Sequence, residues 1–222
     1  MLKRLAAQLP LSWQHALRRV YFHQQIRRRR FVTDEREYTL LDSFLRSGDW
    51  VLDIGANVGH YTMRMSELVG RTGRVIALEP VPDTFALLAA NARLFTHANV
   101  TLLNVAASDR LAAVNIEIPQ FSEGLANYYQ ARLTSDLAGL AVLTLPVDAL
   151  ALPKAVRLVK IDVEGHELAV LRGMRSLLER DHPVLIVETG AQDAVDLLIG
   201  LGYATERLSG SSNLLCRQRE SV

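Results

Sequence analysis

Apolar and polar positions along the chain alternate between two patterns, one typical of buried strands and one typical of helices. Short runs rich in Val, Leu and Ile are followed by longer segments with apolar residues at helical spacing. The expected strands cover residues 50–54, 74–78, 100–105, 156–161 and 183–187, and the expected helices cover residues 33–47, 60–68, 83–95, 167–178 and 191–201. This order predicts an α/β fold with a doubly wound, mostly parallel sheet.

Two stretches depart from this alternation of strands and helices. Residues 202–208 and 214–217 are short strand-like runs separated by Ser, Gly and Asn, so we expect a C-terminal hairpin that adds an antiparallel strand at the end of the sheet. Residues 110–155 contain two strand-like runs and a loop with turn residues. We interpret this stretch as an inserted hairpin and loop beside the cleft, where a substrate would be selected.

The composition is that of a globular enzyme. The 222 residues are 49% hydrophobic and 22% charged, which fits one domain with a full core. We expect neither a membrane span nor a signal peptide, because no apolar run is long enough and the N-terminal residues lack a continuous apolar block. The single cysteine, Cys216, excludes an internal disulfide and a cysteine-based zinc site. These features predict a cytoplasmic protein.

The basic residues are unevenly distributed. Residues 1–30 carry eight Lys or Arg and no acidic residue, while the remainder carries seventeen basic and twenty-four acidic residues, a balance of −7. We therefore divide the chain into a basic helical appendage (1–32), broken at Pro10, and a domain (33–222), for which we expect no nucleic-acid partner. The appendage could pack on the domain and cover its cleft, contact an anionic membrane as a peripheral segment, or serve as a targeting or nucleic-acid-binding tail.

The first core strand ends in the stretch Val-Leu-Asp-Ile-Gly-Ala-Asn-Val-Gly (51–59). Its Asp-x-Gly-x-x-x-Gly spacing differs from the Gly-x-Gly-x-x-Gly of a dinucleotide pyrophosphate turn, and favours a nucleoside with a small charged tail. Gly55 and Gly59 would let the backbone approach a ligand closely. Asn57 is expected to cap the following helix.

Further polar residues follow the next strands, at the edge where ligands of open parallel sheets bind. Glu79 comes twenty-six residues after Asp53, and its carboxylate can accept hydrogen bonds from both hydroxyls of a ribose. Ala106 and Ala107 leave room for a flat base, and Ser108 or Asp109 could accept from its exocyclic amine; ordinary turn chemistry is the alternative for this pair.

Four stretches of the chain resemble the FkbM family of S-adenosylmethionine-dependent methyltransferases. They are residues 51–59, Ala-Leu-Glu-Pro (77–80), Ala-Ala-Ser-Asp (106–109) and Lys-Ile-Asp-Val-Glu-Gly-His-Glu (160–167) with Val170-Leu171-Arg172-Gly173 after it. The first is common to many class I methyltransferases, whereas the block 160–173 is much more specific.

The resemblance implies a seven-stranded, Rossmann-like class I sheet and transfer of a methyl group from S-adenosylmethionine. The implied acceptor is a small-molecule or glycan hydroxyl, such as one on a sugar or polyketide. Residue by residue, it implies that Asp53, Gly55, Asn57 and Gly59 hold the methionine end of the cofactor, that Glu79 holds the ribose, and that Ser108 and Asp109 lie beside the adenine.

An aliphatic hydroxyl becomes a good nucleophile when a base accepts its proton. His166, Asp162 and Glu164 follow the fourth strand at the ligand edge, and His166 is the first choice because its ordinary pKa lies near neutrality. Capping of the next helix by His166, and catalysis by positioning alone, stay open. We expect no metal, because neighbouring residues on one turn rarely converge on one ion.

Other functions compete with O-methylation of a small acceptor. Methylation of nitrogen, or of a macromolecular or membrane-linked glycan, is compatible with the same motifs. A cofactor-binding scaffold without catalysis would keep the same fold. A nicotinamide oxidoreductase fits the alternating pattern but not the glycine spacing at 55–59.

Overall fold

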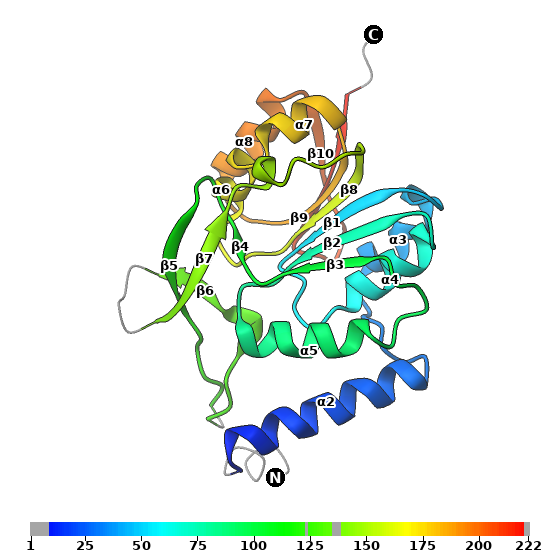
Figure 1. Cartoon of the computed structure of the whole chain (residues 1–222). Coiled ribbons are helices and arrows are strands. Elements are labelled where there is room, and N and C mark those ends of the chain that lie inside the picture. The colour runs from blue at the N-terminus through cyan, green and yellow to red at the C-terminus, as the bar shows by residue number, and fades with distance from the viewer. Residues whose placement is uncertain (1–8, 123, 135–138, 220–222) are drawn as a thin grey trace.

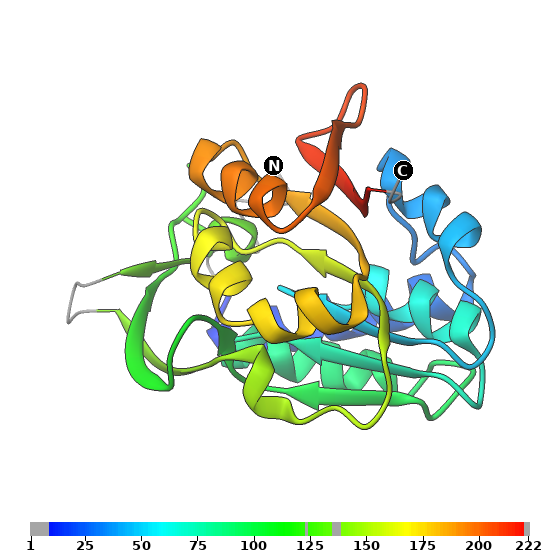
Figure 2. The same ribbon diagram turned by 90° about the horizontal axis from the view of Figure 1, so that it is seen from above.

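The computed structural model describes residues 9–122, 124–134 and 139–219. Strands and helices alternate along these residues, and the strands form two sheets (Figure 1). The larger sheet has helices on both faces, and the smaller sheet projects to one side of it, as the view from above also shows (Figure 2).

The larger sheet has seven strands in the order β10-β11-β9-β8-β1-β2-β3. They are β1 (Trp50–Ile54), β2 (Arg74–Leu78), β3 (Val100–Leu103), β8 (Val156–Ile161), β9 (Val184–Glu188), β10 (Tyr203–Arg207) and β11 (Asn213–Gln218). The pairs among β9, β8, β1, β2 and β3 are all parallel, and β11 is antiparallel to both of its neighbours. The predicted fold class and C-terminal hairpin are therefore confirmed. The antiparallel strand is β11, one position in from the edge strand β10.

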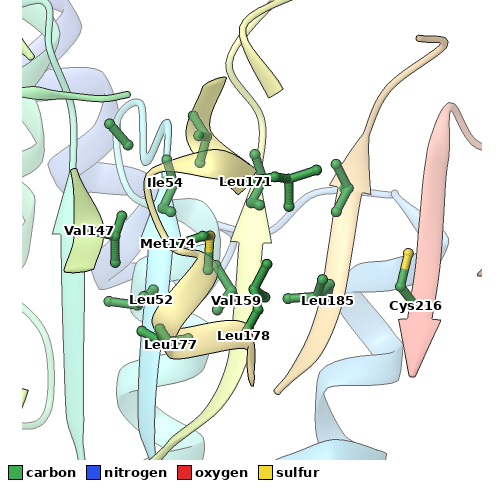
Figure 3. Packing of buried hydrophobic residues seen from close by; sticks show 14 of the residues in the cluster. Leu52, Ile54, Val147, Val159, Leu171, Met174, Leu177, Leu178, Leu185 and Cys216 are labelled. Carbon is green, nitrogen blue, oxygen red and sulfur yellow. The ribbon is translucent and has the colours of Figure 1, made fainter. Parts of the chain in front are cut away.

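The helices pack on the two faces of this sheet because its buried strands are apolar on both sides. They are α3 (Arg36–Phe44), α4 (His60–Val69) and α5 (Pro82–Ala92) on one face, and α6 (Glu167–Arg172), α7 (Arg175–Asp181) and α8 (Gln192–Gly200) on the other. Neighbouring residues of β1 point to opposite faces, so that Val51 packs with α3 and α4 while Leu52 packs with α7. Figure 3 shows Leu52, Val159 and Leu185 facing Met174, Leu177 and Leu178 across this second layer.

The single helix predicted for residues 167–178 is wrong, because the chain breaks between α6 and α7. A Cβ added at Gly173 would lie 1.8 Å from the carbonyl oxygen of Ser108, so only glycine permits this approach. The carboxylate of Asp148 then accepts hydrogen bonds from the backbone N–H groups of Ser176 and Leu177, both at 2.9 Å, and caps the start of α7.

The smaller sheet has four strands in the order β4-β7-β5-β6. Its elements are β4 (Ala106–Ala107), β5 (Ala112–Glu117), β6 (Arg132–Thr134) and β7 (Leu140–Leu145), with the 3-10 helices η1 (Tyr128–Gln130) and η2 (Val147–Leu150). The third strand was predicted to cover residues 100–105, but β3 ends at Leu103. The side-chain amide of Asn104 bonds the carbonyl oxygens of Glu79 and Pro80 at 2.8 and 3.0 Å, and the chain leaves for the second sheet there.

The basic N-terminal segment contains helix α2 (Leu11–Arg27), which lies along α5 (Figure 1). Phe22 is the one buried residue of α2, and it packs with Phe31, Val58, Met63 and Leu87. The helix thus covers the outer side of α5. Within the described residues, no helix is both long and apolar enough to cross a membrane.

Candidate active site

The carboxyl ends of β1, β2 and β8 meet at a cavity of about 240 Å³. Six of the residues predicted for the site line it, namely Gly55, Asn57, Glu79, Asp162, Glu164 and His166. The smaller sheet closes one wall of the cavity with Ala106, Ala107, Ile116 and Leu133.

Glu79 is buried at this edge, with 6% of its surface exposed. One carboxylate oxygen accepts from the backbone N–H of Asn57 at 2.9 Å, and the other accepts from the N–H of Val81 at 3.0 Å. Burial raises the pKa of Glu79 to about 7, against the opposing effect of these two hydrogen bonds. Each oxygen keeps a further lone pair, so the fixed carboxylate can accept from a ligand as well.

Asn57 does not cap the helix that follows it. The N-cap of α4 is Gly59, and it has no side-chain cap. Asn57 instead has the left-handed φ of 49° that directs its N–H to Glu79, and its side-chain Oδ1 is buried without a partner. A buried unpaired oxygen in a cavity wall is costly unless a ligand or water donates to it.

The two glycines of the turn are required by protein packing. A Cβ at Gly55 would lie 1.8 Å from the carbonyl oxygen of Asp162, and a Cβ at Gly59 would lie 2.6 Å from Cδ1 of Leu88. Both residues also have positive φ, at 81° and 98°. Gly55 lines the cavity, whereas Gly59 lies where α4 packs on α5, so the expected close approach to a ligand applies at most to Gly55.

Asp53 lies in a second cavity of about 340 Å³ that shares Glu35, Gly55, Asn57 and Asp162 with the first. Its carboxylate accepts from the hydroxyl of Thr62 at 2.5 Å. Burial raises the pKa of Asp53 to about 6, although the hydrogen bond from Thr62 opposes this change. Asp53 is thus a buried acid beside the turn formed by residues 55–59, with 2% of its surface exposed.

Lys160 lines the second cavity too, and the sequence analysis did not select it as a site residue. It is the register partner of Asp53 on the neighbouring strand β8, and only 2% of its surface is exposed. Its Nζ lies 3.4 Å from Oδ2 of Asp162 and 5.3 Å from the ring centroid of Tyr61. A lysine inside a strand of apolar residues was the available signal, because a buried ammonium group needs a nearby negative charge.

The loop after β8 carries the three predicted catalytic residues. Glu164 and Gly165 both have positive φ, at 48° and 88°. The buried carboxylate of Glu167 holds the loop, because it accepts from the N–H of Gly165 at 2.7 Å and from the hydroxyl of Thr189 at 3.3 Å. Burial raises the pKa of Glu164, and the negative charge of Asp162 adds to that effect.

His166 is half-buried, and its Nε2 lies 2.9 Å from Oγ of Ser108. Ser108 in turn donates a longer hydrogen bond, 3.4 Å, to Oδ1 of Asp109. Burial lowers the pKa of His166, while the negative charges of Asp109 and Glu167 oppose that change. The lowered pKa favours the neutral form of the imidazole, which can accept a proton.

Ser108 and Asp109 do not line the cavity that contains Glu79. They line a neighbouring cavity of about 500 Å³ with Arg110, and His166 and Leu133 border both cavities. The adenine contact expected of Ser108 and Asp109 stays a prediction, whereas their contact with the histidine is a direct feature of the structure. Within the described residues, Asp162, Glu164 and His166 do not form a group that could hold a metal ion.

The sequence and the fold both match known methyltransferases. The sequence profile of the methyltransferase FkbM domain matches residues 53–199. The chain therefore belongs to the FkbM methyltransferase family, as its motifs predicted. Hexuronic acid methyltransferase AglP of Haloferax volcanii is 29% identical over 166 residues, which cover 71% of this chain and 64% of that protein.

Solved structures show the same fold. The FkbM methyltransferase from Methylobacillus flagellatus KT aligns with a TM-score of 0.58 at 20% identity, covering 82% of this chain and 48% of that one. Aeropyrum pernix fibrillarin, solved with natively bound S-adenosyl-L-methionine, aligns with a TM-score of 0.51 at 14% identity, covering 82% and 73%. The chain thus spans about half of the FkbM structure and less than two thirds of the curated relative.

Proposed function

We propose that this chain transfers a methyl group from S-adenosylmethionine to a hydroxyl oxygen of a sugar or related small acceptor. The observation that carries the proposal is that one cavity is lined both by Glu79, a fixed acceptor for a ribose, and by His166, a neutral base. Membership of the FkbM family supports methyl transfer. The likeness to a hexuronic acid methyltransferase supports a sugar as the acceptor.

The donor set fits this cofactor. Glu79 offers its remaining lone pairs to two ribose hydroxyls. The second cavity supplies acids, Asp53 and Asp162, and one buried cation, Lys160, which match the ammonium and carboxylate groups of a methionine end. When bound, the cofactor supplies an electrophilic methyl group on a sulfonium.

The chain's own residues supply positioning and a base. In the tautomer that serves as a base here, Nε2–H of His166 donates to the hydroxyl of Ser108, and that hydroxyl donates to Asp109. The lone pair of this tautomer is on Nδ1, and Nδ1 accepts the proton of the acceptor hydroxyl. Asp109 then stabilises the imidazolium through Ser108. The neighbouring cavity, which His166 borders and whose lining includes Arg110, offers room for the acceptor.

The cofactor assignment can be tested by calorimetric titration of the protein with S-adenosylmethionine and, separately, with NAD. We expect micromolar binding of S-adenosylmethionine and none of NAD. Methylation assays on uronic and neutral sugars, read by mass spectrometry of the product, then identify the acceptor. Binding of NAD alone would contradict the proposal, and cofactor binding with no turnover on any hydroxyl acceptor would favour a non-catalytic scaffold.

Lys160→Met should weaken S-adenosylmethionine binding by roughly tenfold or more, because a charge-assisted hydrogen bond to the methionine carboxylate is worth about 1.5–3 kcal/mol. The same variant should bind 5′-methylthioadenosine with unchanged affinity, because that nucleoside lacks the amino-acid end. Calorimetry with both ligands measures the difference.

The matched variant for this comparison is Glu79→Gln, which should lose affinity for both ligands. Thermal denaturation of each variant separates loss of a ligand contact from loss of the fold, since Lys160 also pairs with Asp162 and lowers the pKa of the buried Asp53. If Lys160→Met weakened both ligands equally, the lysine would serve the structure of the turn, and the assigned carboxylate contact would be wrong.

A further inference from the structure

Helix α2 exposes a stripe of large apolar side chains. Trp13, Leu17, Val20 and Tyr21 are 64, 52, 55 and 57% exposed, and their spacing places them on one face of the helix. Six of the twelve exposed large apolar side chains in the described part of the chain fall within residues 9–21. So large an apolar stripe on a soluble surface marks an interaction site.

The stripe is held away from the protein by contacts on the opposite face of α2. Phe22 is buried there, edge-on to Phe31 with ring centroids 5.8 Å apart. Nε2 of His15 lies 3.5 Å from Oδ2 of Asp83, and the guanidinium of Arg18 lies 4.6 Å from the ring centroid of Tyr128. The helix is therefore docked through one face, and its apolar stripe points outward.

The positive charge around the stripe favours an anionic binding partner. Arg19 and the run Arg27–Arg30 are exposed, and among the described residues none of these five makes an ion pair with an acidic side chain. Arg27 follows Val20 by seven residues and so extends the same face. A second copy docked on this face would bring two arginine clusters together, which like-charge repulsion disfavours. An anionic surface gains from them instead.

We propose that α2 attaches this protein to the surface of an anionic lipid membrane, with the Trp13–Tyr21 stripe in the headgroup region and the arginines on the lipid phosphates. An interfacial helix of this kind combines buried apolar area with electrostatic attraction, and it lies on the membrane rather than across it. At the edge of the stripe, Leu17 also lines an apolar cavity of about 240 Å³ between α2 and the residues Phe121 and Leu125. This attachment is independent of the methyl acceptor.

The test is co-sedimentation of the full chain with vesicles of phosphatidylcholine alone and of phosphatidylcholine mixed with phosphatidylglycerol. We expect binding to the anionic vesicles only, weakened by added salt, with a blue shift of the Trp13 emission. Leu17→Ser/Val20→Ser and Arg27→Gln/Arg28→Gln/Arg30→Gln should each weaken binding at least tenfold. Trp13→Phe should remove the blue shift and keep the sedimentation.

The matched control is Leu111→Ser/Leu143→Ser, which removes two leucines that are at least as exposed as Leu17 from the region of the smaller sheet and should bind as the wild type does. Absence of binding to anionic vesicles would overturn the proposal, as would equal loss of binding in the control. A concentration-dependent dimer in sedimentation velocity that the Leu17→Ser/Val20→Ser variant abolishes would also overturn it, since a second copy would then cover the stripe.

Discussion

Replacement of Glu79 by Gln is expected to weaken S-adenosylmethionine binding by at least a hundredfold. The carboxylate is held by the backbone N–H groups of Asn57 and Val81, and the residue lines the cavity. Two hydrogen bonds from ribose hydroxyls to a charged acceptor are worth about 1.5–3 kcal/mol each, and the amide of glutamine offers only one accepting atom. Calorimetric titration measures the loss.

Binding should also depend on pH through this group. Because burial raises the pKa of Glu79 to about 7, the ionised form that accepts from both hydroxyls is lost as the pH falls through that value. We expect affinity to rise from acid to neutral pH and to level off above it, with a loss of roughly tenfold at about pH 6. In the Glu79→Gln variant, the affinity should no longer change with pH near 7. A change below about pH 6 should remain, because the buried acid Asp53 titrates there.

Glu188→Gln provides the matched control, since it removes a negative charge from the lining of the same cavity. Its carboxylate bonds the hydroxyl of Ser212 at 2.7 Å, so cofactor affinity should change only a few-fold. Wild-type affinity in Glu79→Gln, with an unchanged melting temperature, would show that Glu79 does not hold the ribose.

The main features of this edge could be predicted from sequence because they depend on short-range patterns. Strands β2 and β8 match their predicted bounds, 74–78 and 156–161, since fully buried parallel strands are continuous apolar runs. The acids that end those runs necessarily face one edge of the sheet. Hence Glu79, Asp162, Glu164 and His166 could be expected in one cavity before any coordinates were known.

Features that depend on contacts between distant segments could not be predicted in this way. The helix α6 ends at Gly173, where the backbone of Ser108, sixty-five residues earlier, occupies the space of a side chain. Asn57 is a good capping residue by type, but the nearby carboxylate of Glu79 fixes its backbone in a left-handed turn. The contact between Ser108 and His166 joins the start of the second sheet to the loop after β8, and no local pattern indicates it.

The contact between Ser108 and His166 bears on catalysis, because His166 is the proposed base. His166→Ala should lower kcat by about 10²–10⁴-fold, the range for loss of a general base, while the cofactor dissociation constant stays near the wild-type value. Because burial lowers the pKa of His166, the rate should fall only below the ordinary range of histidine. Single-turnover rates at saturating cofactor, measured across pH with an identified acceptor, give this profile.

The Ser108–Asp109 pair should control the same profile. The negative charge of Asp109 raises the pKa of His166, so Asp109→Asn should move the acid limb of the rate to lower pH and slow the transfer. Ser108→Ala removes the acceptor of Nε2–H and frees the imidazole to change tautomer, so kcat should fall about tenfold or more with little change in cofactor affinity. His97→Ala, a histidine outside these cavities, should leave both quantities unchanged.

A wild-type rate in His166→Ala would contradict the base assignment. Asp162→Asn and Glu164→Gln, measured beside it, decide what replaces that assignment, because both side chains line the same cavity. Loss of rate in only one of them would move the base to that carboxylate. Unchanged rates in all three variants would mean that methyl transfer depends only on positioning of the acceptor oxygen. Ser108→Ala should then also transfer at the wild-type rate. The variant rates, rather than the pH profile, separate these cases, because the raised pKa of Glu164 and the lowered pKa of His166 move toward each other.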